Sequence, residues 1–477
     1  MLAVLLQGVP LPPSLLESAS DPGEARAAWI VLSMLVLMGV WWVTEAIPIP
    51  VTSLLPLVIL PVCGVLTISE AAAPYMHPVV VLLLGGFIVA KAIERWNLHA
   101  RIALTIVDRI GTSPTRLIAG FMFASAILSM WISNTATSIM MMPIAISAAA
   151  EIVGRDRLDS PFTWALLLGI AWSCSIGGLG TLVGTPTNLI VVGYLNDNAG
   201  LDIDFVQWMM IGLPAVAFLL PAAWFVLTRW AFSIERTGQS GGRDAIGADL
   251  RALGRVTTPE WRTIGVFAAV AFLWVFRRQL AQIELAGTTP FAGLTDHVIA
   301  IIGVILCFVV PSGAARAPRS ALLDWKSAES IPWGVLLLFG GGFSLANAIT
   351  VTGLSPWIGR ELAVFATVPT VVLVAIITAL VMFLTEVTSN VATASALIPV
   401  FGALALSTGI DVGLLAVPLA LSASCAFMLP MATGPNAVAF ATGHVTLATM
   451  ARAGLRLNLV AIALLTAITC ILVPLVF

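Results

Sequence analysis

Charged side chains are scarce in this sequence: 24 acidic and 22 basic residues make up only 10% of the 477. Soluble domains carry about a quarter charged residues, so this shortage excludes an ordinary soluble fold. The net charge of -2 and the lack of a basic stripe give no indication of a nucleic-acid partner. Apolar residues make up 59% of the chain and recur in long runs, which is typical of a polytopic helical membrane protein.

Cysteine and histidine are also rare, with five and four residues. No cysteines form a CxxC pair, and the histidines have no ligand-spaced partners, so the sequence predicts no metal centre built from these side chains. It also lacks an HExxH motif, and no His or Asp lies in the apolar core to activate a serine. An intramembrane hydrolase is therefore disfavoured, and we expect that the protein is not an enzyme.

Apolar runs between charges and Pro or Gly breaks predict ten membrane crossings. They lie near residues 27–47, 51–66, 79–96, 161–195, 207–231, 259–277, 294–311, 332–350, 409–443 and 454–477. Two further apolar stretches, 114–150 and 368–400, are too long for one helix and carry Ser, Asn and Thr near their middles. Each stretch is either two full spans or one re-entrant hairpin, and charge bias does not separate these cases.

The basic residues fix an orientation, because cytoplasmic loops collect Lys and Arg. The ten crossings place 18 of the 22 on one membrane face, hereafter the basic side, and leave only Arg26, Arg277, Arg278 and Arg360 on the other. We therefore expect both termini outside and the segment 232–258 in the cytoplasm. The expected location is the inner (plasma) membrane, crossed many times.

The sequence contains an internal repeat. A displacement of 256 residues places Gly85-Gly86-Phe87 on Gly341-Gly342-Phe343 and Ser133-Asn134 on Ser389-Asn390. A displacement of 248 places the GTPTN sequence at 184–188 on ATGPN at 432–436. Each half holds an odd number of crossings, so the second half enters the membrane from the opposite side. Inverted repeats with interrupted segments indicate a secondary transporter whose binding site lies near mid-membrane, rather than a channel with a continuous pore.

Four segments rich in small polar residues lie at membrane depth: 129–138, 181–188, 385–393 and 431–436. They contain no Lys, Arg or His, and their one charge is Glu386, which either tunes a cation site or faces scaffold or water. The plainer alternative is that the small polar residues only let helices pack closely. A helix broken at depth offers free N–H groups to an anion and free C=O groups to a cation. Without a basic side chain, a bound cation supplies the remaining charge, and a cage of neutral oxygens suits Na⁺.

These residues carry a specific resemblance. The SNT at 133–135, the SNV at 389–391, the GTPTN at 184–188 and the MLPMATGPNAVAFATG at 428–443 are similar to the divalent anion/sodium symporter family. The segments WWVTEAIPIP at 41–50 and IPWGVLLLFGGGFSLA at 331–346 resemble its scaffold, so the likeness covers 29–477. In this family the interrupted stretches are re-entrant hairpins with SN motifs at their tips.

The resemblance implies a set of site residues. One Na⁺ would bind Ser129, Ser133, Asn134 and the Gly184 loop, and a second would bind Thr385, Thr388, Asn390 and the Ala432 loop. A dicarboxylate would contact Ser133, Asn134, Thr135, Thr185, Ser389, Asn390 and Gly434. Many bacterial relatives carry Thr where this chain has Val391 and Pro where it has Gly434, which leaves substrate identity open.

The resemblance also implies an all-α fold of two inverted repeats, each with five transmembrane helices and one hairpin, in a homodimer of elevator type. The expected divisions are a tail at 1–26, scaffold helices at 27–111, a transport half at 112–231, a linker at 232–258, scaffold helices at 259–366 and a transport half at 367–477. The expected activity is Na⁺ symport of a succinate-, malate- or fumarate-like di- or tricarboxylate into the cell. A sulfate transporter and a dicarboxylate exchanger are the alternatives.

Overall fold

The computed structural model describes residues 11–16, 21–110, 113–234, 247, 250–284, 288–315, 320–362 and 367–477. Most of the predicted linker and residues 1–10 of the predicted tail lie outside this part of the chain. Within it the named elements of secondary structure are all helices, and isolated bridge residues occur only in the connections, as between Pro311 and Ala321. The same residues include nine helices that are long and apolar enough to cross a membrane. The prediction of an all-α polytopic membrane protein is confirmed.

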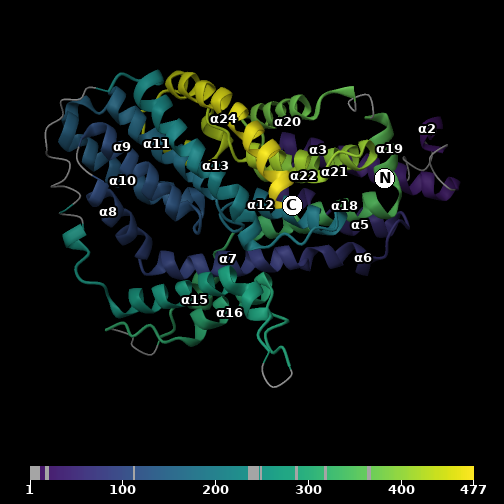
Figure 1. Cartoon of the computed structure of the whole chain (residues 1–477), viewed down its shortest axis with the longest axis horizontal. Helices are drawn as coiled ribbons and strands as arrows, with labels where there is room; N and C mark the ends of the chain where they lie inside the picture. The colour runs from purple at the N-terminus through teal and green to yellow at the C-terminus, as the bar shows by residue number, and fades with distance from the viewer. Residues whose placement is uncertain are drawn as a thin grey trace.

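The helices follow the two halves of the sequence (Figure 1). The first half contains α2 (Pro13–Leu16), α3 (Pro22–Thr44), α4 (Ile49–Thr52), α5 (Pro56–Val62), α6 (Ile68–Ala72), α7 (Pro78–Arg95), α8 (Leu98–Ile110), α9 (Pro114–Ser129), α10 (Asn134–Val153), α11 (Pro161–Gly178), α12 (Pro186–Asn198) and α13 (Phe205–Phe225). The second contains α15 (Thr258–Ala281), α16 (Asp296–Val309), α17 (Trp325–Ala328), α18 (Trp333–Val351), α19 (Leu354–Glu361), α20 (Thr370–Leu384), α21 (Asn390–Thr408), α22 (Val412–Ala423), α23 (Gly434–Ala441) and α24 (Leu447–Val476).

The order of elements repeats between the halves. The series from α7 to α13 matches the series from α18 to α24 one for one, including the two helix breaks. Proline sets many of the helix starts: Pro78, Pro114, Pro161 and Pro186 each occupy the first helical position, where a missing N–H costs nothing. The internal repeat predicted from sequence is therefore a repeat of structure.

One predicted crossing differs in the structure. The stretch expected at 51–66 forms two short helices, α4 and α5, in place of one continuous helix. Pro50 and Pro56 lie in the first turns of these helices and Pro61 lies inside the second. Each proline lacks a backbone N–H, so a continuous hydrogen-bond ladder cannot form through this sequence.

The two interrupted stretches are re-entrant hairpins. At the tip between α9 and α10, the Met130 carbonyl accepts a hydrogen bond from the Thr181 hydroxyl, which lies in the break between α11 and α12. At the tip between α20 and α21, Glu386 accepts hydrogen bonds from the break between α22 and α23. Each tip therefore meets a helix break within the bundle, which favours the re-entrant hairpin over two full spans.

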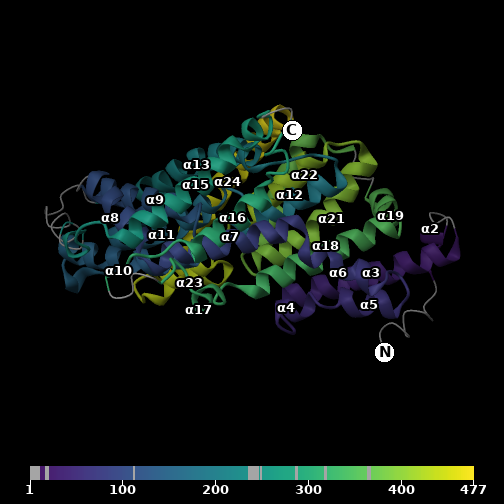
Figure 2. The same cartoon turned by 90° about the horizontal axis from the view of Figure 1, so that it is seen from below.

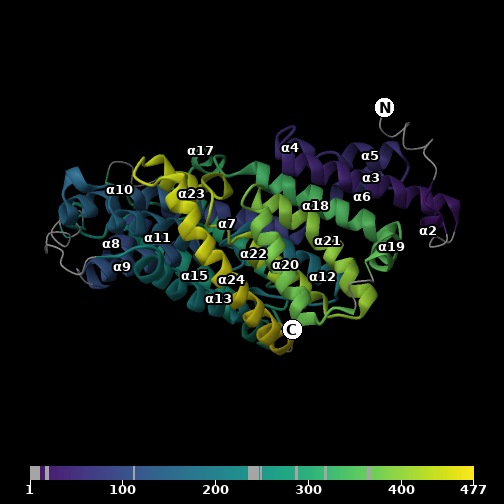
Figure 3. The same ribbon diagram turned by 90° about the horizontal axis from the view of Figure 1, so that it is seen from above.

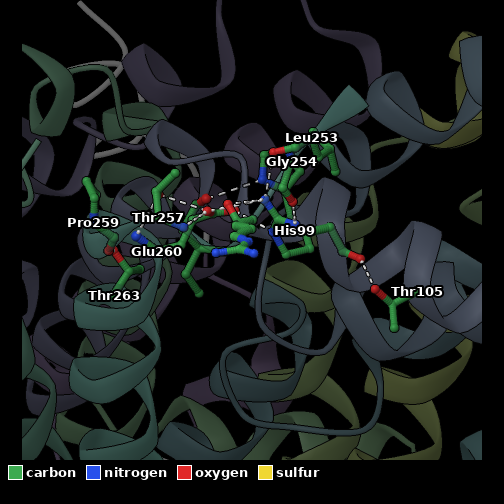
Figure 4. A network of polar contacts seen from close by, with 11 residues as sticks. His99, Thr105, Leu253, Gly254, Thr257, Pro259, Glu260 and Thr263 are labelled. Atoms are coloured by element: carbon green, nitrogen blue, oxygen red, sulfur yellow. Dashed lines mark hydrogen bonds and ion pairs between the residues drawn. The ribbon is translucent and has the colours of Figure 1, made fainter. Parts of the chain in front are cut away.

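Ion pairs at the helix ends agree with this topology. On the basic side, Arg95 pairs with Asp324 at 2.5 Å, and Arg101 pairs with Glu260 at 2.7 Å while it donates to the carbonyls of Leu253 and Gly254 (Figure 4). The Arg101 contacts join α8, the start of α15 and the end of the connection between the two halves. The charge bias places Arg95, Arg101 and the segment 232–258 on this same side.

The site lies in a bundle formed by α9–α13 and α20–α24. α11 is buried along most of its length, and it packs against α9, α10 and α13. α7, α15 and α16 pack together along one flank, and α18 packs against α3, α4, α5 and α6 (Figure 1). Figures 2 and 3 show α8–α10 at one end of the molecule and α2–α6 at the other.

Close packing of α11 on α9 depends on Gly177. A Cβ at this position would lie 2.3 Å from the Ala126 carbonyl oxygen and 2.6 Å from its Cα, and both belong to backbone that cannot rotate away. Gly177→Ala therefore forces the two helices apart, at a cost of about 1–3 kcal/mol for overpacking. We expect a clear drop in the melting temperature of the detergent-solubilised protein.

Gly39→Ala is the matched control, because a Cβ at Gly39 in α3 meets nothing within 4 Å. Alanine favours the helix there, so the melting temperature should hold or rise. Equal loss of stability in both variants would contradict the close α9–α11 contact.

Candidate functional site: two hairpin tips at one cavity

The hairpin tips bring helix ends of both signs together. α9 ends at Ser129 and Ser133 caps the start of α10. In the second half, Thr385 is the C-cap of α20 and Ser389 caps the start of α21. The C-terminal ends of helices such as α9 and α20 favour a cation, and the N-terminal ends of helices such as α10 and α21 favour an anion. Each tip thus offers half-sites for both kinds of ion.

Asn134 is held at the first break by close backbone contact. Its Oδ1 accepts a hydrogen bond from the Ser129 hydroxyl. A Cβ at Gly178 would lie 3.0 Å from both polar atoms of the Asn134 side chain and 3.1 Å from the Gly184 carbonyl oxygen. The glycine therefore lets the amide lie against the break. Ser129, Asn134 and Gly184 are brought together, as predicted.

Two asparagines hold the breaks themselves. The Nδ2 group of Asn188 donates to the carbonyls of Gly178 at 3.0 Å and Thr181 at 2.7 Å. The equivalent Asn436 donates to Ala426 at 3.0 Å and Leu429 at 3.1 Å. Both side chains are fully buried, and they supply donors to carbonyls of the broken turns, where helical partners are missing.

The second tip has a different local network. Thr388 donates to the Leu384 carbonyl at 2.8 Å, and its hydroxyl lies 2.7 Å from that of Thr393. The Thr385 hydroxyl donates to the Met382 carbonyl at 3.2 Å. Asn390 Oδ1 is buried and accepts no hydrogen bond from the described part of the chain. A buried carbonyl oxygen without a donor is costly, and a cation is one group that would satisfy it.

One cavity is lined by both tips. Asn134 and Thr135 reach it from the first hairpin, and residues 387–391 reach it from the second. The loop 431–435 and the end of α3, with Thr44 and Glu45, complete the wall. Among these lining residues the only charge is that of Glu45. The cavity contains no fixed positive side chain, as the sequence predicts.

A second cavity lies on the other side of the first tip. Ser133, Asn134 and Thr135 line it together with Gly184, so Asn134 and Thr135 separate the two cavities. Lys91 also lines this second cavity, but its ammonium lies 2.7 Å from Glu94 on the same helix. The pair is neutral as a whole, so it supplies no net positive charge for an anion.

A contact between the halves closes one wall of the first cavity. A Cβ at Gly434 would lie 2.0 Å from Thr135 Oγ1 and 3.0 Å from its Cβ. The first hairpin tip therefore touches the loop of the second half because residue 434 has no side chain. The side chain of proline would not fit this arrangement either.

Some predicted residues lie away from both cavities. Thr185 is 5% exposed, and its hydroxyl lies 3.4 Å from that of Ser424 in the other half. Ser129 and Thr385 are fully buried beneath the tips. The roles of these three residues stay predictions, and for Thr185 the geometry indicates packing between the halves. Thr433, its counterpart, does line the first cavity and caps α23.

Sequence reasoning missed several residues that build the site. Gly178 was given no role because its partner Asn134 is distant in the sequence, and Ser175 reaches the first cavity from α11. Thr393 was also given no role, although its hydroxyl lies 2.7 Å from that of Thr388 in the same hairpin tip. Asn188 and Asn436 stood in the aligned motifs, and their superposition across the repeat was the available signal. Glu386 faces neither water nor scaffold, because it is buried against the second break.

Comparison with known proteins agrees with this architecture. Residues 16–476 match the family described as the sodium:sulfate symporter transmembrane region. The sodium-dependent dicarboxylate transporter SdcS of Staphylococcus saprophyticus is 41% identical over 464 residues, covering 96% of this chain and 88% of that protein. The SdcS of Staphylococcus aureus USA300 is 38% identical over 452 residues, covering 94% and 86%.

Two solved structures share the fold at low sequence identity. The YdaH transporter of Alcanivorax borkumensis superposes with a TM-score of 0.60 at 14% identity, covering 95% of this chain and 99% of that one. MtrF of Neisseria gonorrhoeae gives 0.59 at 14% identity, with coverage of 99% and 97%. With the repeats, the paired hairpins and the family match in agreement, the chain belongs to the sodium:sulfate symporter family of membrane transport proteins.

Proposed function

We propose that this protein carries a dicarboxylate across the membrane together with Na⁺. The observation that carries the proposal is the cavity lined by both hairpin tips, which has small polar groups and no fixed cation. The names of the two SdcS relatives, at 41% and 38% identity over nearly the whole chain, support both the dicarboxylate and the sodium dependence.

The cation sites follow from the helix ends. The ends of α9 and α20 supply carbonyl oxygens, and Asn134 and Asn390 supply amide oxygens. The unpaired Oδ1 of Asn390 supports a cation at the second tip, since no described donor competes for it. Neutral oxygens without a carboxylate cluster suit Na⁺ better than Ca²⁺. No group of three or more His, Cys, Asp or Glu residues in the described part of the chain could hold another metal.

The anion site uses the opposite ends of the same tips. The Ser133 and Ser389 positions begin α10 and α21, and the Thr135 hydroxyl adds a donor on the cavity wall. Helix N-termini contribute about half a positive charge each, which balances a dianion only in part. Bound Na⁺ supplies the remainder. Each asparagine lies between the two ligands, so one ligand builds the site of the other.

The second cavity opens toward the basic side, which supports an inward-open arrangement. Lys91, Glu94 and Ser330 line the second cavity, and charge bias places all three on the basic side. Toward the opposite side, α12 packs tightly on α18, where a Cβ at Gly193 would lie 2.5 Å from the Phe343 ring. His77 and Asp197 pair at 3.2 Å beside this contact. Movement of α9–α13 and α20–α24 against the flanking helices would open that side, which is the elevator form of the proposal.

The assembly is proposed as a homodimer in the inner membrane, with both termini outside.

Sulfate remains the second candidate substrate, because the family description names it and a sulfate-sized dianion meets the same electrostatics. A dicarboxylate exchanger is the third alternative. In reconstituted vesicles, competition by unlabelled sulfate tests the sulfate alternative. Net movement of charge during transport separates Na⁺ symport from exchange.

Asn134→Ala and Asn390→Ala test the site. Each change removes an oxygen shared by the cation and the anion, so we expect loss of at least about 90% of Na⁺-driven succinate uptake into proteoliposomes, a tenfold effect that corresponds to about 1.4 kcal/mol. Asn347→Ala on α18 is the matched control, because this exposed asparagine lies outside both cavities. Normal uptake by either site variant would contradict the assignment.

Gly434→Ala tests the contact between the halves. The new methyl group overlaps the Thr135 hydroxyl, so Thr135 leaves its position and half-maximal uptake should need about tenfold more succinate, as expected when contacting residues couple. Adding Thr135→Ala removes most of the overlap, so the double variant should be no worse than Thr135→Ala alone. If the effects of the two single substitutions on the half-maximal succinate concentration simply multiply in the double variant, the two residues do not touch.

A further inference from the structure

Glu386 is a buried carboxylate surrounded by donors. Its side chain is 3% exposed, in the hairpin tip after α20. Oε1 accepts from the backbone N–H of Phe427 at 2.8 Å and of Met428 at 3.0 Å, and Oε2 accepts from Met428 at 3.1 Å and Leu429 at 3.0 Å. The Nδ2 group of Asn458 in α24 donates to Oε1 at 2.8 Å. Five hydrogen bonds therefore converge on one side chain.

These bonds use the whole capacity of the carboxylate. Oε1 has three donors and Oε2 has two, which is about the number of lone-pair positions that the group offers. Glu386 forms none of the ion pairs found among the described residues. Its oxygens therefore have no room for Na⁺, and its charge is held by N–H groups alone, which form strong charge-assisted bonds.

The bonded loop leads directly into the cavity wall. Residues 427–429 lie between α22 and α23, and Met431, Ala432, Thr433 and Gly434 follow in the lining of the first cavity. Successive N–H groups in such a break have no helical partner, and at membrane depth no water replaces it. Without Glu386 the loop would lose the bonds that fix its path toward residue 434.

The first half holds its loop with neutral groups. The position equivalent to Glu386 is Met130, whose backbone carbonyl accepts from the Thr181 hydroxyl. Trp208 of α13, the counterpart of α24, donates its indole N–H to the Leu179 carbonyl at 3.0 Å. In both halves the residue at the hairpin tip thus accepts from a donor in the loop, but only in the second half is that acceptor a charged side chain. The repeat symmetry is broken at this one charged residue.

We propose that Glu386 is a positioning residue that holds the loop 427–429 in the geometry that the second cation site requires. The inference rests on the proposed function for its kinetic consequence, but the loop contact itself does not depend on it. Glu386 acts through the loop and touches neither ion. When the loop is held in only a tenth of the molecules, the apparent Na⁺ affinity falls about tenfold while saturating Na⁺ restores the rate.

The loop contact is tested first, by hydrogen exchange of the purified full-length protein in Na⁺-free buffer. In Glu386→Gln an amide NH₂ faces backbone donors, so peptides that cover 427–429 should exchange at least about tenfold faster than in the parent protein. Peptides that cover 179–183 should not change, because Trp208 and Thr181 still hold that loop. Unchanged exchange at 427–429 would overturn the proposal.

Transport gives the second readout, with succinate uptake measured over a range of Na⁺ concentrations. Glu386→Gln should raise the Na⁺ concentration for half-maximal uptake at least about tenfold with a nearly unchanged maximal rate. A purely structural role would instead lower the maximal rate and leave the Na⁺ dependence as it was, and that result would overturn the proposal. Glu151→Gln, the same substitution at an exposed position on α10, should behave as the parent protein.

Asn458→Ala covers the case in which Glu386→Gln does not fold. It keeps the carboxylate and removes one of its four donor groups, so we expect a smaller shift of exchange and Na⁺ dependence in the same direction, and no shift would count against the inference. The two ideas fail in different ways. If the parent protein shows no Na⁺-dependent uptake, the proposed function fails while the exchange result stands. If Asn390→Ala loses uptake and Glu386→Gln has normal exchange and kinetics, only the loop inference fails.

Discussion

Backbone polar groups that are buried in a membrane need partners, and this requirement shapes the whole site. Two crossing segments break at mid-depth, and each break exposes N–H and C=O groups that water cannot reach. Asn188 and Asn436 pair with the carbonyls of the two breaks at equivalent positions. The hairpin tips provide the other partners, through Met130 in one half and Glu386 in the other. The hairpin tips therefore supply hydrogen-bond partners that the helix breaks need, in addition to any role in binding a ligand.

The same requirement explains how a neutral site can hold an anion. Polar groups left over at the tips are oriented by helices in opposite directions, so one tip offers oxygen to a cation and N–H to an anion. Near the cavities, Lys91 pairs with Glu94 and Glu386 is enclosed by donors, so the charge left on the wall of the first cavity is the negative charge of Glu45. A dianion in this setting depends on a co-bound cation. The binding of the anion and of Na⁺ is therefore coupled because the site has no fixed positive side chain.

Much of this arrangement could be predicted from sequence. Charges and Pro or Gly breaks marked the ends of the apolar runs, the displacement of 256 residues marked the repeat, and the SN pairs marked the tips, because these signals are local or repeat in order. The split of 51–66 into α4 and α5 could have been inferred from its prolines. The contact of Gly178 with Asn134 and the burial of Thr185 against Ser424 could not, since they depend on which helices meet in three dimensions.

The central claim is that Na⁺ supplies the positive charge that the protein does not. Linkage requires that the factor by which Na⁺ raises succinate affinity equals the factor by which succinate raises Na⁺ affinity. Equilibrium binding of labelled succinate to the purified protein, with Na⁺ replaced stepwise by K⁺ at constant ionic strength, tests this most directly. The account predicts that succinate affinity falls continuously with Na⁺ and is lost in K⁺ alone. Equal affinity in the two salts would contradict it.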